Sequence, residues 1–226
     1  MNGLIEGGKA AIQVDDGTSY FYFYGGAVKG DLLGLSGVLV DGDATFDGST
    51  IRSGYVTIEE GTLTLMKPHT TFIGDFDMEE SNSVLEMYLG NDTNPALPVL
   101  KVTGTTDIAP GAQLRLLARS SDFRVSPGGT RYTLISSGNL VGGNNLTVTS
   151  TSALLDVKSF GVVGNDITSV VTTKSSEVLA ENTLAVGGSD NAATAVGHVP
   201  GLLARLDEQD PVFQAFANAG TDAELA

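Results

Sequence analysis

Three of the six tyrosines stand at alternate positions of one short segment, at Tyr20, Tyr22 and Tyr24. Alternate residues of a β-strand point to the same face. With Phe21 and Phe23 directed inward, the three tyrosine rings are expected to point outward together. Rings in such a row could stack on sugars or contact a protein partner. The alternative is that a neighbouring loop covers them and that they have no binding role.

A second candidate is the group Asp41, Asp43 and Asp47, in the segment Asp-Gly-Asp-Ala-Thr-Phe-Asp-Gly. Asp41 and Asp43 could share a face, and Ca²⁺ prefers such hard oxygen ligands. The spacing matches neither an EF-hand loop nor the nonapeptide repeat of calcium-binding solenoids. A solvated turn is therefore the favoured interpretation, with calcium binding as the alternative.

Adjacent carboxylate pairs also occur, at Asp15-Asp16, Glu59-Glu60 and Glu79-Glu80. Neighbouring residues of a strand point to opposite faces, so these pairs are not expected to converge on one substrate. A glycan-cleaving enzyme would need carboxylates from neighbouring strands on one solvent face, which depends on the register of those strands.

The chain offers little else for catalysis, because it contains no cysteine and two histidines, His69 and His198. His69 follows Pro68 in a turn and His198 lies in the C-terminal segment. Both are interpreted as solvated loop histidines, since a catalytic base must also be oriented by a third group. Neither a Gly-x-Ser-x-Gly motif nor a phosphate-binding glycine loop occurs. We expect a protein that is not an enzyme and that uses no metal or cofactor.

The charge balance narrows the possible partners. The chain has 226 residues with 12 Lys+Arg and 27 Asp+Glu, a net charge of −15. Such a chain lacks the basic face with which proteins bind nucleic acid, so a nucleic-acid partner is not expected. The apolar fraction of 41% is sufficient for a folded core. No apolar run approaches the roughly 20 residues that a membrane-spanning helix needs.

The elements that must position these residues are mainly β-strands. From residue 3 to about 173 the apolar residues follow a period of two, and Gly, Asn, Asp and Pro separate the runs. Each predicted strand carries only one or two inward aliphatics, as at Val56 and Ile58 or Leu114 and Leu116. Such units bury their apolar side only by stacking on one another. The pattern predicts an all-β fold, a right-handed parallel β-helix with about seven or eight coils of roughly 20–25 residues.

The pattern changes after Lys174, and we expect two parts: a β-helical stem over residues 1–173 and a helical linker over residues 174–226. Asp210 and Pro211 form an N-cap and first-turn pair, and Thr221 begins a capping box with Glu224. A further helix is predicted over residues 201–208, with Leu202, Leu203 and Leu206 on one face. The tail carries too few apolar residues to form a second core of its own.

The order of several segments resembles the C-terminal stem of passenger domains in type V (autotransporter) secretion systems of Gram-negative bacteria. These segments are Gly74-Asp75-Phe76-Asp77, residues 83–87 (SVLEM), 98–105 (PVLKVTGT), 109–114 (APGAQL), 130–135 (TRYTLI), 210–218 (DPVFQAFAN) and 223–225 (AEL). Together they cover residues 72–226. Residues 175–199 depart from the pattern, because Gly187-Gly188-Ser189-Asp190 stands where related tails usually carry a long Ala-rich helix. Residues 1–70 resemble the family only in style.

The resemblance implies a right-handed parallel β-helix whose export depends on its own C-terminal outer-membrane β-barrel, the expected partner of this chain. It also implies that the last coils act as an autochaperone, and that the protein reaches the cell surface or is secreted through the periplasm and outer membrane. The expected function is a non-enzymatic passenger stem that displays a virulence or adhesion factor. One alternative is an adhesin that binds a glycan or itself through its β-helix face, which an exposed tyrosine row would favour. The other is a glycan-cleaving β-helix enzyme, which clustered carboxylates would favour.

Overall fold

The computed structural model describes residues 2–15, 17–89, 92–118, 129–203, 205–207, 209–217 and 219–226. Asp16, Ala204, Glu208 and Asn218, which belong to segments discussed above, lie outside these residues. The strands are β1 (Asn2–Gln13), β2 (Tyr20–Phe23), β3 (Gly25–Asp41), β4 (Ala44–Asp47), β5 (Thr50–Leu65), β6 (Thr70–Met78), β7 (Ser83–Leu89), β8 (Leu100–Val102), β9 (Thr105–Ile108), β10 (Gln113–Ala118), β11 (Thr130–Ser136), β12 (Asn139–Val141), β13 (Thr147–Ser150), β14 (Leu155–Val163) and β15 (Asp166–Thr173). The helices are the 3₁₀ turn η2 (Gly143–Asn145), α1 (Ser176–Ala185), α2 (Asp190–Gly197), α3 (Val199–Leu203), α4 (Pro211–Ala217) and α5 (Asp222–Leu225).

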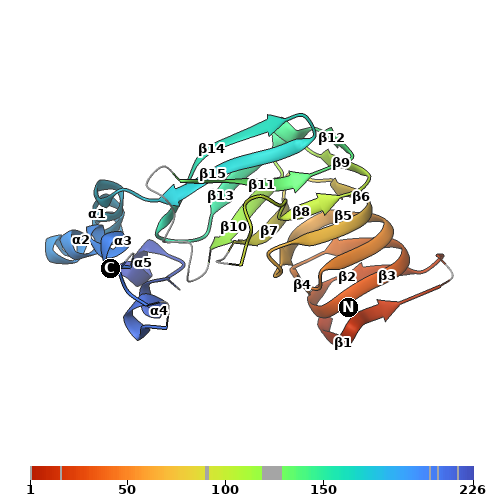
Figure 1. Cartoon of the computed structure of the whole chain (residues 1–226), viewed down its shortest axis with the longest axis horizontal. Coiled ribbons are helices and arrows are strands. Elements are labelled where there is room, and N and C mark those ends of the chain that lie inside the picture. The colour runs from red at the N-terminus through yellow and green to blue at the C-terminus, as the bar shows by residue number, and fades with distance from the viewer. Residues whose placement is uncertain are drawn as a thin grey trace.

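The described chain is therefore mostly β with short C-terminal helices, as the sequence predicts. Most strand pairs are parallel, and the strands lie one above another from β1 toward β10 and β13 (Figure 1). Three ladders of hydrogen-bonded strands run along this stack. Each includes a row of inward side chains. These rows are Val28, Phe46, Leu65, Met87 and Leu116 in the first ladder, Leu32, Ile51, Phe72 and Val102 in the second, and Phe23, Val40, Ile58, Met78 and Ile108 in the third.

Every residue in these inward rows is at most 2% exposed. The predicted inward residues Val56, Ile58, Leu114 and Leu116 are also buried, so the period-two assignment is confirmed. The chain turns corners between ladders at closely stacked glycines. Gly61 has φ +83°, and a Cβ there would lie 2.6 Å from the backbone of Gly42. Only glycine suits such a corner.

The expectation of parallel pairing throughout is wrong at the C-terminal end of the sheet. There β11 pairs antiparallel with β15, and β15 pairs antiparallel with β14. The physical reason for the β14–β15 pair is the short connection at Gly164-Asn165, since two strands joined by so short a loop can pair only as a hairpin. Gly164 has φ +62°, as such a turn requires.

The C-terminal segment is more helical than the sequence predicts. Serine side chains cap two helices: Ser175 accepts a hydrogen bond from Val178 N and Ser189 one from Ala192 N. The predicted capping box at Thr221 is present, and Asp210 Oδ1 accepts a hydrogen bond from Val212 N at 2.8 Å. The helix predicted over 201–208 is instead α3, which ends at Leu203.

The helices do not lie free of the sheet. Leu203 and Phe213 are fully buried and belong to the same hydrophobic cluster as Leu154, before β14. Leu202, predicted to share one helical face with Leu203 and Leu206, is instead 44% exposed. Among the described residues, no helix has the length and apolarity needed to cross a membrane.

Candidate binding face

The short strand β2 presents its tyrosines to solvent, as predicted. Tyr20, Tyr22 and Tyr24 are 53%, 48% and 55% exposed, whereas Phe23 between them is 1% exposed. Phe21 packs edge-on against Phe23, with ring centroids 5.4 Å apart. Because β2 pairs with β3 in regular register, the buried Phe23 and the partly buried Phe21 anchor the strand and hold the tyrosines outward.

A fourth tyrosine, Tyr55 on β5, joins this row, although its distance in the sequence does not predict this. Tyr20 pairs with Gly37 on β3, and Gly37 pairs with Tyr55. A Cβ at Gly37 would lie 2.7 Å from the Tyr55 ring, so that ring lies over the glycine. The Tyr20 and Tyr55 ring centroids are 6.5 Å apart. The absent side chain at Gly37 therefore lets tyrosines two strands apart meet.

The remaining two rings are stacked on each other. Tyr22 and Tyr24 have centroids 6.1 Å apart and planes 12° from parallel. We call Tyr20, Tyr22, Tyr24 and Tyr55 the tyrosine face. It offers several flat aromatic surfaces beside one another, which suits a ligand with flat apolar faces of its own.

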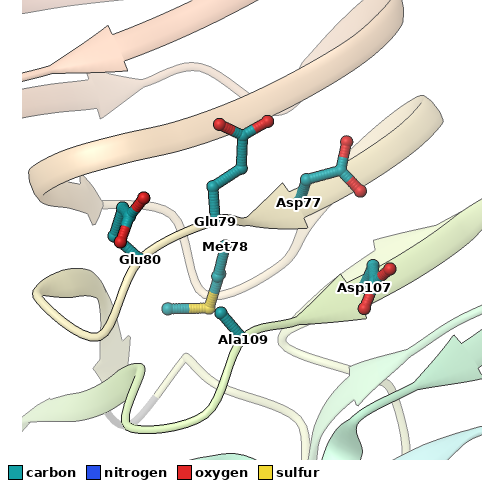
Figure 2. Close-up of a pocket in the computed structure, with 6 residues that line it drawn as sticks. All are labelled: Asp77, Met78, Glu79, Glu80, Asp107 and Ala109. Atoms are coloured by element: carbon teal, nitrogen blue, oxygen red, sulfur yellow. The ribbon is translucent and has the colours of Figure 1, made fainter.

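Carboxylates continue the same rows along the stack. Tyr55 pairs with Asp75 on β6, while Thr57 pairs with Asp77, which in turn pairs with Asp107 on β9. Figure 2 shows the carboxylates of Asp77 and Asp107 on the same side of their neighbouring strands. We call Asp75, Asp77 and Asp107 the carboxylate row. Asp75 and Asp77 share β6, whereas Asp107 lies on β9, so the strand register brings Asp107 beside Asp77.

The three carboxylates have different surroundings. Asp75 Oδ1 accepts a hydrogen bond of 2.7 Å from Thr105 N, so this side chain ties β9 to β6. Asp77 lines a shallow pocket of about 430 Å³ with Asp107 and Glu79 (Figure 2). Burial, followed by the charges of Asp107 and Asp75, raises the pKa of Asp77 to about 6.

The adjacent pairs Glu59-Glu60 and Glu79-Glu80 also meet, against expectation. Together with Asp41 they line one surface depression, which we call the acidic corner. Each pair lies where its strand bends or ends, so the alternation of faces that should separate its members no longer holds there. Burial, followed by the charge of Glu79, raises the pKa of Glu59. Asp15 is exposed on its own, and its partner Asp16 lies outside the described residues.

The tyrosine face and the acidic corner adjoin. Burial, followed by the proximity of Tyr20 and Tyr22, raises the pKa of the Tyr55 hydroxyl, and the charge of Glu59 adds to the effect. Aromatic rings and carboxylates therefore lie within a few strands of one another on this side of the molecule.

The calcium alternative at Asp41, Asp43 and Asp47 finds no support in the geometry. Asp47 forms an ion pair with Lys67 at 2.8 Å, whereas Asp41 faces the acidic corner. Within the described part of the chain, no group of three His, Cys, Asp or Glu side chains is arranged to hold a metal ion.

His69 is not the solvated loop residue that the sequence suggests. Its Nδ1 lies 2.9 Å from the carbonyl oxygen of Pro98, and its Nε2 accepts a hydrogen bond from Asn94 N at 3.1 Å. A neutral ring with its proton on Nδ1 satisfies both contacts, so His69 fastens a loop. His198 lines a separate pocket between β15 and α1, beside Lys158 and Lys174.

No protein family model, curated protein or solved structure matches the chain. The function must therefore be inferred from the architecture and from the chemistry of this face. Exposed rings and carboxylates can stack on a ligand and accept its hydrogen bonds.

Proposed function

We propose that the chain is a right-handed parallel β-helix that serves as the non-enzymatic passenger stem of a type V autotransporter. The observation that carries this proposal is the first ladder, in which Val28, Phe46, Leu65, Met87 and Leu116 stack on consecutive parallel strands. Coils that bury a row only against their neighbours form an elongated scaffold suited to surface display.

The C-terminal end supports an autochaperone role. The antiparallel group β11, β15 and β14 closes the stack, and the hairpin β14–β15 is made of local contacts that form quickly. Once formed, this end offers a template on which each preceding coil can pair. Its location within residues 72–226 agrees with the segment that resembles autotransporter stems.

Refolding of the chain itself tests this order. In pulse-labelling hydrogen exchange, amides of β14 and β15 should gain protection before those of β3 and β5. Protection that begins at β3, or that appears everywhere at once, would contradict the autochaperone proposal.

Display at the cell surface, through the periplasm and the chain's own outer-membrane barrel, is the second part of the proposal. In a barrel-bearing precursor, deletion of residues 71–173 should leave the remaining passenger sensitive to added protease on intact cells. Unchanged protease resistance would contradict a folding role for these coils.

A second function, adhesion through the tyrosine face, is favoured by the exposure of Tyr20, Tyr22 and Tyr24 at about half of each side chain. Four neighbouring aromatic residues are more than scattered surface exposure requires. The partner would be a glycan or a second copy of the chain. Sedimentation of the wild-type chain and of the Tyr22→Ala variant over a range of concentrations separates the two, since only self-association depends on concentration.

A further inference from the structure

The tyrosine face and the carboxylate row lie along one track on the third ladder. Its positions run from Tyr22 through Leu39 and Thr57 to Asp77 and Asp107, and Thr57, between the two ends, is 3% exposed. Four strand spacings of about 4.8 Å give this track a length of about 20 Å. A ligand that uses both ends must therefore be an extended polymer lying along the stack.

The chemistry of the track selects the polymer. Ionised carboxylates only accept hydrogen bonds, so the ligand must supply donors. Ion pairs between described residues are Lys67–Asp47, Arg115–Glu86 and Lys174–Asp222. None of these includes Asp77, Asp107, Glu59 or Glu79, so the face presents negative charge that the described cations do not neutralise. An anionic polymer would be repelled and a cationic one attracted.

We propose that this track binds a cationic amino-sugar polymer, with pyranose rings stacked on the tyrosine face and ammonium groups against Asp77, Asp107 and the acidic corner. The inference rests on the adhesive function proposed above and names its ligand chemistry. A sugar ring has a flat C–H face for each tyrosine and hydroxyl donors for the carboxylates. A cationic peptide would instead need pockets for its side chains, and the depressions here are shallow and lined by carboxylates.

Binding by the full chain can be followed calorimetrically and by tyrosine fluorescence, since the chain contains no tryptophan. The probes are a glucosamine hexamer, its neutral N-acetylated counterpart and hexalysine. The glucosamine hexamer should bind most tightly, and its affinity should fall as salt rises. Equal affinity for the neutral hexamer would overturn the charge argument while leaving glycan adhesion in place. Equal affinity for hexalysine would show that the sugar rings are not recognised.

Variants locate the site. Tyr22→Ala should weaken binding of the glucosamine hexamer by about tenfold. Asp77→Asn should weaken it several-fold at pH 7 and reduce the salt dependence. Gly37→Ala keeps every tyrosine but displaces the Tyr55 ring, so weaker binding by this variant identifies the ring arrangement itself. The matched control is Asp156→Asn, at an exposed position of β14, which should bind as the wild type does.

Three further results would overturn the proposal. One is an Asp156→Asn variant that loses as much affinity as Asp77→Asn, which would reduce the effect to net charge. Another is a Tyr22→Ala variant with unchanged affinity and an unchanged thermal midpoint. The third is shortening of the hexamer during incubation, which would make the carboxylates a cleavage site and favour the enzyme alternative.

Discussion

Asp77 should destabilise the fold at neutral pH, and replacing it with asparagine should relieve this effect. Burial, followed by the charge of Asp107 beside it in register, raises the pKa of its carboxyl group from 3.8 to about 6. A raised pKa means that the folded state holds the proton more tightly than the unfolded chain. The ionised group therefore lowers stability progressively between about pH 4 and pH 6, and the full effect is present above pH 6.

The size of the effect follows from the shift. A rise from 3.8 to about 6 corresponds to an upper limit of about 3 kcal/mol, at about 1.4 kcal/mol per pKa unit. Asp77 is partly exposed, and solvent and salt screen its repulsion with Asp107, so about half of this limit is realistic. We expect Asp77→Asn to stabilise the chain by about 1–2 kcal/mol at pH 7.5 and by almost nothing at pH 3.5.

Urea unfolding at both pH values measures this difference. Asp107→Asn should give a smaller gain of the same sign, and the double variant should gain less than the sum of the two, because each change removes the same repulsion. Asp156→Asn is the control and should change stability little at either pH. Equal or lower stability of Asp77→Asn at pH 7.5 would refute the reasoning.

Three further predictions concern stability. Leu114→Asp buries an unpaired charge and should lower the free energy of unfolding by on the order of 4 kcal/mol, whereas Arg115→Asp on the outer face should lower it by about 1 kcal/mol or less; equal losses in urea unfolding would contradict the inward and outward assignment. Thr70→Val should raise stability by about 1 kcal/mol, because Thr70 Oγ1 is buried with no hydrogen-bond partner among the described residues; a lower melting midpoint would show that the hydroxyl is bonded. A chain ending at Lys174 should keep its β-type circular dichroism but melt several degrees lower, since removal of Phe213 uncovers the end of the core; an unchanged midpoint would show that the tail contributes no stability.

Much of the interior follows from alternation alone. The period of two assigns Phe21 and Phe23 to one face of the strand and Tyr20 and Tyr22 to the other. The register between paired strands has no comparable periodic pattern in the sequence. The meeting of Tyr55 with Tyr20 depends on both pairing with Gly37, so the fourth tyrosine could not be assigned to the face from spacing.

The same limit explains the carboxylates. Asp77 and Asp107 are neighbours because of a register between β6 and β9, which are separated in sequence by β7, β8 and their connections. Glu59-Glu60 joins Glu79-Glu80 because each pair lies where its strand bends or ends. The antiparallel end carried a readable signal at Gly164-Asn165, a dipeptide typical of tight hairpins. Helices α1 and α2 left weaker signals, since small residues fill them and only the capping serines Ser175 and Ser189 mark their starts.

The ladders also bear on how freely the chain can vary in length. Leu63 pairs with Leu85 and Leu85 with Leu114, although the second interval is longer because it includes a long connection between β7 and β8. The extra residues leave the pairing of β7 with β10 in register. Each strand pairs only with the strand before it and the strand after it in its ladder. An insertion at a corner therefore leaves the register of the other strands unchanged. Such a scaffold can accept new loops, including loops from other proteins, at its corners without a change in the strand pairings that determine its fold.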